Sequence, residues 1–401
     1  MRLNNRFNNI PAFGLPIYMA LMLIPLAELR FFEYQSTYSA PRLFQIGSVF
    51  FFILLSVYSV FLKSKSYRRI EFTSSIPLIL LFIYILASSS ISINPLQSFI
   101  YAIVTVIFIS GCFYFWLVNQ KTVYLSFGLA ALSVIISLVY LAFELPIRER
   151  TLGWISPNLI GHLGFFLIVC SAFNKPKILL PIAVIGIILI IFSESRTVFV
   201  SSIIFLATFL IISNVIKNFK QAALLVITFI LLAPIFLMLA SSIVEIGTEV
   251  STALLGVDDA SRTSGTGLSG RSTYWANATQ VISERPLFGY GFRTRETLAL
   301  SAGPSVNAHS GLLNLLLDLG VIGGLLYFYV YVSSIIRSLV IFYQNRSYQS
   351  IHRTTSVVSI SFLVSYVPIL LVEPNYMNLS HPTSMLLLLF ISYSLLTNRS
   401  N

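Results

Sequence analysis

Two arginines and one histidine between residues 196 and 309 have side-chain types suited to phosphate binding and to acid–base chemistry. Arg196 lies in a very short connection between two apolar runs, and Arg271 lies in a long segment rich in glycine, serine and threonine. An arginine presents a planar fork of donors that matches phosphate oxygens. His309 directly precedes another apolar run, and a neutral imidazole can accept a proton from a hydroxyl nucleophile. These residue types favour phosphate ligands beside a general base.

Structural interpretations of the same residues stay open. Glu194 is a candidate ion-pair partner for Arg196 at the membrane boundary. A single histidine at a helix start is commonly a cap or a surface residue, although the backbone N–H groups there also favour anions. Asp318 lies nine residues after His309, which on a continuous helix means about 180° of rotation and roughly 14 Å of rise. Asp318 is therefore not included among the catalytic candidates. A charged carboxylate inside an apolar run costs free energy, which implies that Asp318 has a partner.

Metal-binding and nucleotide-binding motifs are missing from the sequence. No HExxH or CxxC spacing occurs, and the four histidines are scattered: His162, His309, His352 and His381. No GxxxxGK[ST] loop occurs either. We therefore expect neither a metal ion nor a cofactor, and a phosphorylated substrate that is activated before it arrives.

The elements that carry these residues are predicted to be membrane-spanning helices. Charged residues make up 10% of the chain, against roughly 25% in soluble domains, and the mean hydropathy is +0.86. Apolar stretches of roughly 17 to 25 residues recur, as a spanning helix requires. A β-barrel would need alternating segments, and the run Ile178–Phe192 does not alternate. The expected fold class is all-α and polytopic, with about twelve transmembrane helices.

The predicted organisation is two groups of spans separated by one long loop. Residues 1–244 hold spans 1 to 9, residues 245–308 form the loop, and residues 309–401 hold spans 10 to 12. The tenth span is long enough to tilt or to start outside the membrane. The predicted spans are 11–29, 43–62, 76–93, 98–118, 123–143, 158–173, 177–193, 197–213, 221–244, 309–341, 355–372 and 382–397.

Charge in the short connections predicts the orientation. If the N- and C-termini are cytoplasmic, all the lysines lie on the cytoplasmic side of the membrane. The acidic residues then lie on the other side, except for Glu71 and Asp318. The loop at 245–308 then lies on the non-cytoplasmic side. Several arginines also lie outside, against the general bias: Arg30, Arg42, Arg148, Arg150, Arg196, Arg262, Arg271, Arg285, Arg293 and Arg295.

The net charge of +11 does not indicate nucleic-acid binding. Much of it follows from the excess of cations beside anionic lipid headgroups on the cytoplasmic face. Cys112 and Cys170 fall inside predicted spans. They are therefore interpreted as small buried hydrophobic residues rather than as a disulfide.

The long loop contains one predicted helix, at about 272–284, with Trp275, Ala278 and Ile282 on one face. Arg285–Pro286 ends it, and a glycine-rich turn follows. Such an amphipathic helix either lies on the membrane interface or caps the helix bundle. The loop follows the ninth span rather than the sixth, which a transporter built from two similar halves does not predict.

Four short motifs, in a fixed order around the long loop, resemble the bacterial O-antigen ligase and polymerase superfamily, membrane glycosyltransferases of the GT-C class. The resemblance is dense over residues 190–325 and weak elsewhere, with Gly153 and Pro157-Asn158 as an extra point. The motifs are Ser195-Arg196-Thr197; Ser269-Gly270-Arg271 with Trp275; Pro286-Leu287-Phe288-Gly289-Tyr290-Gly291-Phe292; and Ala308-His309-Ser310-Gly311 leading to Asp318-Leu319-Gly320 and Gly323.

The resemblance implies glycan transfer from an undecaprenyl diphosphate carrier on the periplasmic face of the bacterial inner membrane, without a metal. Arg196 and Arg271 would hold the diphosphate, and His309 would act as general base with inversion at the anomeric carbon. Arg293 and Arg295 are secondary candidates. Ser310 follows the histidine where the family more commonly has asparagine, which leaves open what orients the base or the acceptor.

Several activities remain after the resemblance is considered. A polymerase of O-antigen or exopolysaccharide repeat units is preferred to a ligase that transfers polymer to lipid A core. Expected partners are the carrier-linked donor, a glycan or lipid A-core acceptor and the bilayer, together with other polysaccharide assembly proteins, and no nucleic acid. Alternatives of other classes are a transporter or flippase for lipid-linked glycans, and a structural partner in an export complex.

Overall fold

The structure is a computed structural model, and it is almost wholly helical. It describes residues 13–23, 47, 50–54, 72–116, 120–144, 147–148, 151–152, 156–173, 176–216, 218–233, 235, 271–295, 298, 308–345, 351–379 and 381–396. Within these ranges, the only strands are β1 (Ile147–Arg148) and β2 (Thr151–Leu152), which form one short antiparallel pair. The predicted all-α fold class is confirmed apart from this two-residue pairing.

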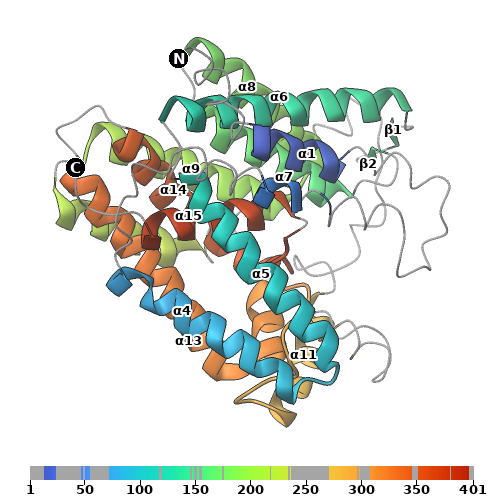
Figure 1. Ribbon diagram of the computed structural model, residues 1–401. Coiled ribbons are helices and arrows are strands. Elements are labelled where there is room, and N and C mark those ends of the chain that lie inside the picture. The colour runs from blue at the N-terminus through green and yellow to red at the C-terminus, as the bar shows by residue number, and fades with distance from the viewer. Residues whose placement is uncertain are drawn as a thin grey trace, which may run out of the picture.

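The helices vary in length and follow one another along the chain with short connections between most of them (Figure 1). Their bounds are α1 (Gly14–Leu23), α4 (Phe72–Ser88), the 3₁₀ turn η4 (Ser89–Ile91), α5 (Pro95–Trp116), α6 (Gln120–Glu144), α7 (Pro157–Ser171), α8 (Pro176–Ser193), α9 (Arg196–Asn214), α11 (Arg271–Glu284), α13 (Gly311–Gln344), α14 (Ile351–Val372) and α15 (Pro382–Leu396).

Among the residues that the structure describes, six helices are long and apolar enough to cross a bilayer, so the predicted membrane class is confirmed. These candidate spans are Ser74–Ile91, Pro95–Phe113, Thr122–Phe143, Arg196–Asn214, Gly311–Gln344 and His352–Val372. Shorter apolar helices occupy Pro157–Ser171, Leu180–Ser193, Phe219–Ala233 and Pro382–Leu395. The predicted spans 11–29 and 43–62 and the loop 245–308 lie largely outside the described residues, so the total of about twelve and the orientation stay predictions.

Small residues and serines allow the helices to approach closely, as is common in membranes. A Cβ at Gly164 on α7 would lie 2.5 Å from the carbonyl oxygen of Gly186 on α8. Elsewhere in the bundle, Ser338, Ser359 and Ser394 join α13, α14 and α15, with oxygen–oxygen distances of 2.6 to 3.2 Å. Cys112 and Cys170 are buried free thiols, as predicted.

Helices α4, α5 and α13 run together along one side, and α11 lies at their far end (Figure 1). Helix α11 begins and ends almost where the sequence predicted. Trp275, Ala278 and Ile282 cluster with Tyr290 and Leu317, so the apolar face of α11 packs on α13. The interpretation of α11 as a cap on the bundle is therefore correct, and its apolar face is not left for lipid.

Helix α13 is not the continuous helix from His309 that the sequence suggested. It begins at Gly311, after the N-cap Ser310, and Gly320 breaks it with φ of 63° and ψ of −170°. The segment Pro286–Gly291 docks into the break and satisfies the backbone groups that the break releases. The hydrogen bonds are Val321 N to Pro286 O (2.8 Å), Ile322 N to Leu287 O (3.2 Å), Tyr290 N to Leu317 O (2.9 Å) and Gly291 N to Asp318 O (2.8 Å).

Glycine is required in both parts of this contact, in α13 and in the docked segment itself. Gly320 has a positive φ, and a Cβ there would lie 2.3 Å from the carbonyl oxygen of Leu287. Gly289 also has a positive φ, of 68°, and a Cβ there would lie 2.6 Å from the amide nitrogen of Gly320. Only glycine adopts this conformation without a steric cost while allowing so close a backbone approach. The motifs Pro286–Gly291 and Asp318–Gly320 therefore have a structural explanation as the two halves of one junction.

Candidate functional site

Arg271, the first residue of α11, is bound to the end of α14. Its Nη1 donates to the carbonyl oxygen of Val372 at 2.7 Å, and its Nη2 lies 3.4 Å from Oε1 of Glu373. The Arg271 side chain is 20% exposed and the Glu373 side chain only 4%. The guanidinium is thus held in a fixed place while part of its surface stays accessible.

Glu373 joins three elements at one point. Besides the contact with Arg271, its carboxylate accepts a hydrogen bond from the hydroxyl of Thr197 near the start of α9. Burial raises the pKa of Glu373, and the Arg271 charge and these hydrogen bonds oppose that rise by favouring the carboxylate. The start of α9, the start of α11 and the end of α14 therefore meet at this carboxylate.

His309 lies at the same place, immediately before α13. The Ser310 side chain caps α13 by accepting from the amide of Leu313 at 3.3 Å. A Cβ at Gly311 would lie 2.9 Å from the carbonyl oxygen of Leu370 and 3.0 Å from that of Glu373. The backbone that carries His309 is therefore packed directly on the end of α14. His309 itself has a φ of 45°, an unusual conformation for a residue with a side chain.

The His309 imidazole is half-buried and interacts electrostatically with the Arg271 guanidinium. Burial, and after it the Arg271 guanidinium, lower the pKa of His309 below its ordinary value, because both disfavour the imidazolium. The Tyr274 ring packs edge-on against the imidazole, with 5.1 Å between centroids. His309 is therefore neutral at pH 7 and able to accept a proton.

Arg196 is the first residue of α9, after Ser195 at the N-cap position. It is partly buried and directly precedes Thr197, which contacts Glu373. The structure thus brings Arg196, Arg271 and His309 to one region around Glu373, although they are far apart along the chain. The pairing of Glu194 with Arg196 stays a hypothesis.

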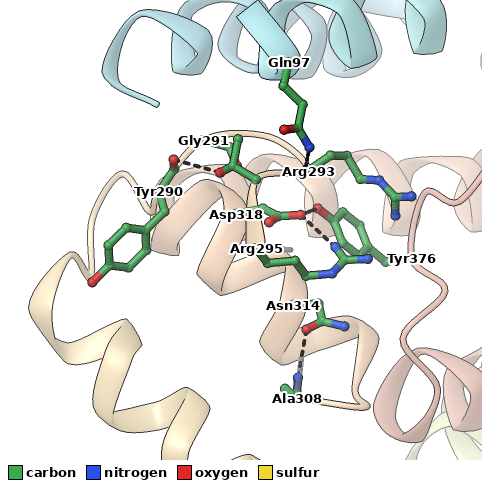
Figure 2. A network of polar contacts seen from close by, with 10 residues as sticks. Gln97, Tyr290, Gly291, Arg293, Arg295, Ala308, Asn314, Asp318 and Tyr376 are labelled. Atoms are coloured by element: carbon green, nitrogen blue, oxygen red, sulfur yellow. Dashed lines mark hydrogen bonds and ion pairs between the residues drawn. The ribbon is translucent and has the colours of Figure 1, made fainter. Parts of the chain in front are cut away.

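The other two candidate arginines belong to a different cluster (Figure 2). Arg295 is buried, and its Nη1 lies 2.9 Å from Oδ2 of Asp318, which also accepts from the Tyr376 hydroxyl. The Arg295 guanidinium stacks over the Tyr376 ring, 5.6 Å from its centroid. Asp318 therefore has the partner that its position in an apolar run implied, and that partner is Arg295.

Arg293 belongs to the same junction. Its carbonyl oxygen accepts from Nε2 of Gln97 at 3.3 Å, and its guanidinium lies over the Tyr101 ring on α5, 5.6 Å from the centroid. One turn before Asp318, Asn314 accepts from the Ala308 amide at 3.1 Å. This last bond ties the residue before His309 to the same face of α13 as the Asp318 cluster (Figure 2).

Sequence reasoning missed the segment after α14. Glu373 and Tyr376 are polar residues directly after an apolar run, which was a usable signal for a site at that helix end. The segment also contains Asn375, whose Nδ2 lies 3.2 Å from Nε2 of His381. Burial lowers the pKa of His381 to about 3, so this imidazole is neutral.

Two of the histidines that looked scattered are neighbours in the fold. The His162 and His381 rings pack edge-on with 4.4 Å between centroids, and Thr383 hydrogen-bonds to both, at 3.4 and 3.0 Å. In the described part of the chain, no group of three or more His, Cys, Asp or Glu residues has a geometry suited to a metal ion.

Residues 181–328 match the family model described as O-antigen ligase. The matched stretch contains Arg196, Arg271 and His309, whereas Glu373 lies beyond its end. No curated protein matches the chain. The match confirms the resemblance to the O-antigen ligase and polymerase superfamily, and it supports a membrane protein with a ligase-type or polymerase-type role.

Proposed function

We propose, with the family match over residues 181–328 as the premise, that this protein is a glycosyltransferase of the bacterial inner membrane. Its donor is an undecaprenyl-diphosphate-linked glycan, and its preferred activity is polymerisation of O-antigen or exopolysaccharide repeat units on the periplasmic face. The observation that carries the proposal is the meeting of Arg271, Thr197 and the His309 segment at Glu373. This arrangement supports the proposal, because an arginine suited to binding phosphate then lies beside a histidine suited to act as a base.

Arg196 and Arg271 bind the diphosphate in this proposal. A guanidinium has five N–H donors, and the two contacts of Arg271 to α14 leave others for a ligand. The diphosphate gains charge as it leaves, and donors that are already oriented stabilise that charge without reorganising. Glu373 is buried and fixed, so it orients Arg271 rather than competing with the ligand for exposed surface.

His309 accepts the proton of the acceptor hydroxyl. The hydroxyl oxygen attacks the anomeric carbon of the donor, a new glycosidic bond forms, and the bond to the diphosphate oxygen breaks. Attack opposite to the leaving group inverts the configuration. The proton moves to the imidazole and the electron pair leaves on undecaprenyl diphosphate, so no metal and no further reactant is needed. The lowered pKa of His309 keeps the imidazole available as the base.

The alternative acceptor is lipid A core, which would make the protein an O-antigen ligase. The description of the matching family as O-antigen ligase favours this activity. Deletion of the gene separates the two activities. Loss of a polymerase leaves single repeat units capped on lipid A, whereas loss of a ligase leaves polymer on the carrier.

Transport of lipid-linked glycan is the alternative from another class. It predicts ionisable residues distributed around a central cavity. In the described helices, the acidic residue Asp318 is instead neutralised by Arg295 in a buried pair. Purified protein that moves glycolipid between leaflets but never forms a glycosidic bond would contradict the enzyme proposal.

The decisive experiment uses full-length protein in liposomes with a synthetic carrier-linked repeat unit. His309→Ala, Arg271→Ala and Arg196→Ala are each expected to abolish carrier release and chain growth. Arg285→Ala is the matched control, because Arg285 is exposed and stacks over the Tyr290 ring. If carrier release survives all three changes, the proposed mechanism is wrong.

A further inference from the structure

Five large apolar side chains are exposed where α4, α5 and the docked segment Pro286–Gly291 meet. Two belong to the docked segment, and the other three lie at the end of η4, in the connection after it and at the start of α5. Together they are called the apolar rim: Leu287 (55% exposed), Phe288 (50%), Ile91 (45%), Ile93 (42%) and Leu96 (70%). Contiguous exposed apolar residues of this kind mark contact with a membrane or another protein.

The two parts of the rim are held side by side by the backbone. The amide of Ile93 donates to the carbonyl oxygen of Tyr290 at 3.1 Å. A Cβ at Gly291 would lie 2.2 Å from the hydroxyl oxygen of Ser92. The rim is therefore a built surface, formed by two segments that are distant in sequence.

The rim continues the outward face of α13. Val321, Leu325 and Phe328 are spaced as residues on one helix face and are 40%, 64% and 63% exposed. The stripe is joined to the rim at its first residue, because the amides of Val321 and Ile322 donate to carbonyl oxygens of the docked segment at 2.8 and 3.2 Å. An apolar stripe on a membrane-spanning helix faces lipid, so the rim adjoins a lipid-facing surface.

The length of α13 indicates how deep in the bilayer the apolar rim lies. A 34-residue helix is about 51 Å long, and roughly 20 residues cross the hydrocarbon core. The part after Gly320 is by itself long enough to cross, so the break lies near one membrane boundary. The docked segment is attached at this break. The rim is therefore at the level where headgroups meet acyl chains.

The outward face of α11 differs from the rim in chemistry. Its exposed residues are mainly polar and include Thr273, Asn277, Thr279, Gln280 and Ser283. The exposed Arg285 lies between the two surfaces in sequence. A cation next to apolar residues suits the boundary between lipid phosphates and acyl chains.

We propose that the apolar rim is embedded in the interfacial layer of the bilayer and anchors the docked segment at a fixed depth. The occupant of this surface is the lipid that already surrounds α13. The anchor holds the break in α13, and the Arg295–Asp318 pair beside it, at a constant height relative to the headgroups. This anchoring requires only that the chain spans a membrane, and it does not depend on the proposed catalytic activity.

Depth-resolved fluorescence quenching tests the anchor in the full-length protein. Cys112 and Cys170 are buried, so a single introduced cysteine can be labelled selectively with an environment-sensitive fluorophore in lipid nanodiscs. The rim variants are Phe288→Cys and Leu96→Cys, which report independently from the two segments. Gln280→Cys is the control for water, and Leu325→Cys is the control for the hydrocarbon core.

Probes at 288 and 96 are expected to be quenched best by lipids with a nitroxide high on the acyl chain. Their quenching by aqueous iodide should be severalfold weaker than at 280, and deep nitroxides should quench them less than at 325. Iodide quenching equal to that at 280 would overturn the proposal. Protection from both iodide and all lipid quenchers would also overturn it, because a second copy or a protein partner would then cover the rim.

Discussion

Glu373 determines how Arg271 is presented. An exposed arginine has many rotamers and loses entropy when it binds a ligand. Here the carbonyl oxygen of Val372 and the Glu373 carboxylate accept from two different nitrogens of the guanidinium, which restricts it to one orientation. Tyr274, three residues along α11, contacts His309. One short helix therefore carries both the proposed phosphate ligand and the ring that packs on the proposed base.

Glu373→Gln is expected to lower the rate of transfer while the protein remains folded. The substitution keeps the shape of the side chain but weakens its bond to Arg271. A hydrogen bond to a charged group contributes about 1.5–3 kcal/mol, which corresponds to a loss of about tenfold or more. Initial rates of carrier release measure the effect. Glu284→Gln, at a carboxylate bound to the Tyr290 hydroxyl, should leave the rate unchanged, and equal effects at both positions would refute a role for Glu373 in orienting Arg271.

The pH dependence of transfer is expected to report His309. The base must be neutral, so kcat/KM falls as pH drops through the pKa of His309, which burial and Arg271 lower below the ordinary value of 6.5. Arg271→Gln removes the neighbouring cation and raises that pKa. The acid limb of the profile should therefore move to higher pH in this variant, in addition to the lower rate. An acid limb that stays in place, or moves to lower pH, would contradict His309 as the base.

At the scale of elements, the break in α13 at Gly320 determines how α13 is joined to its neighbouring segments. A continuous helix would have no free backbone groups at this level for the Pro286–Gly291 segment to bind. Gly320 releases them, and Tyr84 of α4 donates its hydroxyl to the Leu319 carbonyl oxygen at 2.8 Å. The break therefore joins α4, α13 and the segment after α11 into one unit.

Gly320→Ala is expected to destabilise this unit. The new Cβ would lie 2.3 Å from the Leu287 oxygen and would require a positive φ, which costs about 1–3 kcal/mol for a residue other than glycine. Gly324→Ala is the matched control, since its Cβ would meet only a Leu316 methyl group at 3.0 Å. Thermal unfolding in detergent should show a lower Tm for the first variant only. Similar Tm values for both would argue against the docked junction.

The Arg295–Asp318 pair is expected to behave as a coupled buried ion pair. Removal of one partner from such a pair leaves an unpaired charge and costs about 3–5 kcal/mol. Arg295→Met alone should therefore lower Tm more than the double variant Arg295→Met/Asp318→Asn, in which neither charge remains. Additive losses in the double-mutant cycle would mean that the two side chains do not act together.

At the scale of the whole molecule, the side of the membrane that carries the site follows from the distribution of lysine and arginine. The charge pattern predicts that both termini are cytoplasmic. A fluorescent protein fused after Asn401 should then be bright, and a periplasmic alkaline phosphatase reporter at the same position should be inactive. The opposite pair of results would place the candidate site on the cytoplasmic face.

Much of the candidate site was predictable because its residues stand out locally. Arg196 and His309 each border an apolar run, and Arg271 directly precedes the predicted helix at 272–284, which has a clear apolar face. Glu373 was not predictable as the partner of Arg271, because 102 residues separate them. Arg295 is a secondary site candidate from the sequence, and only the fold shows that it pairs with Asp318. A guanidinium has the same chemistry in either setting, and only its neighbours distinguish the two.

The sequence by itself determined that this is a helical membrane protein, and it predicts one long loop that carries many of its polar residues. Run length, hydropathy and charge are properties of consecutive residues, so no packing information is needed to read them. The tertiary structure decided which of these polar residues act together. The break at Gly320, the docked segment and the meeting of three helix ends at Glu373 depend on contacts between distant parts of the chain. Such contacts arise only when the helices pack, because buried charges and free backbone groups must then find partners.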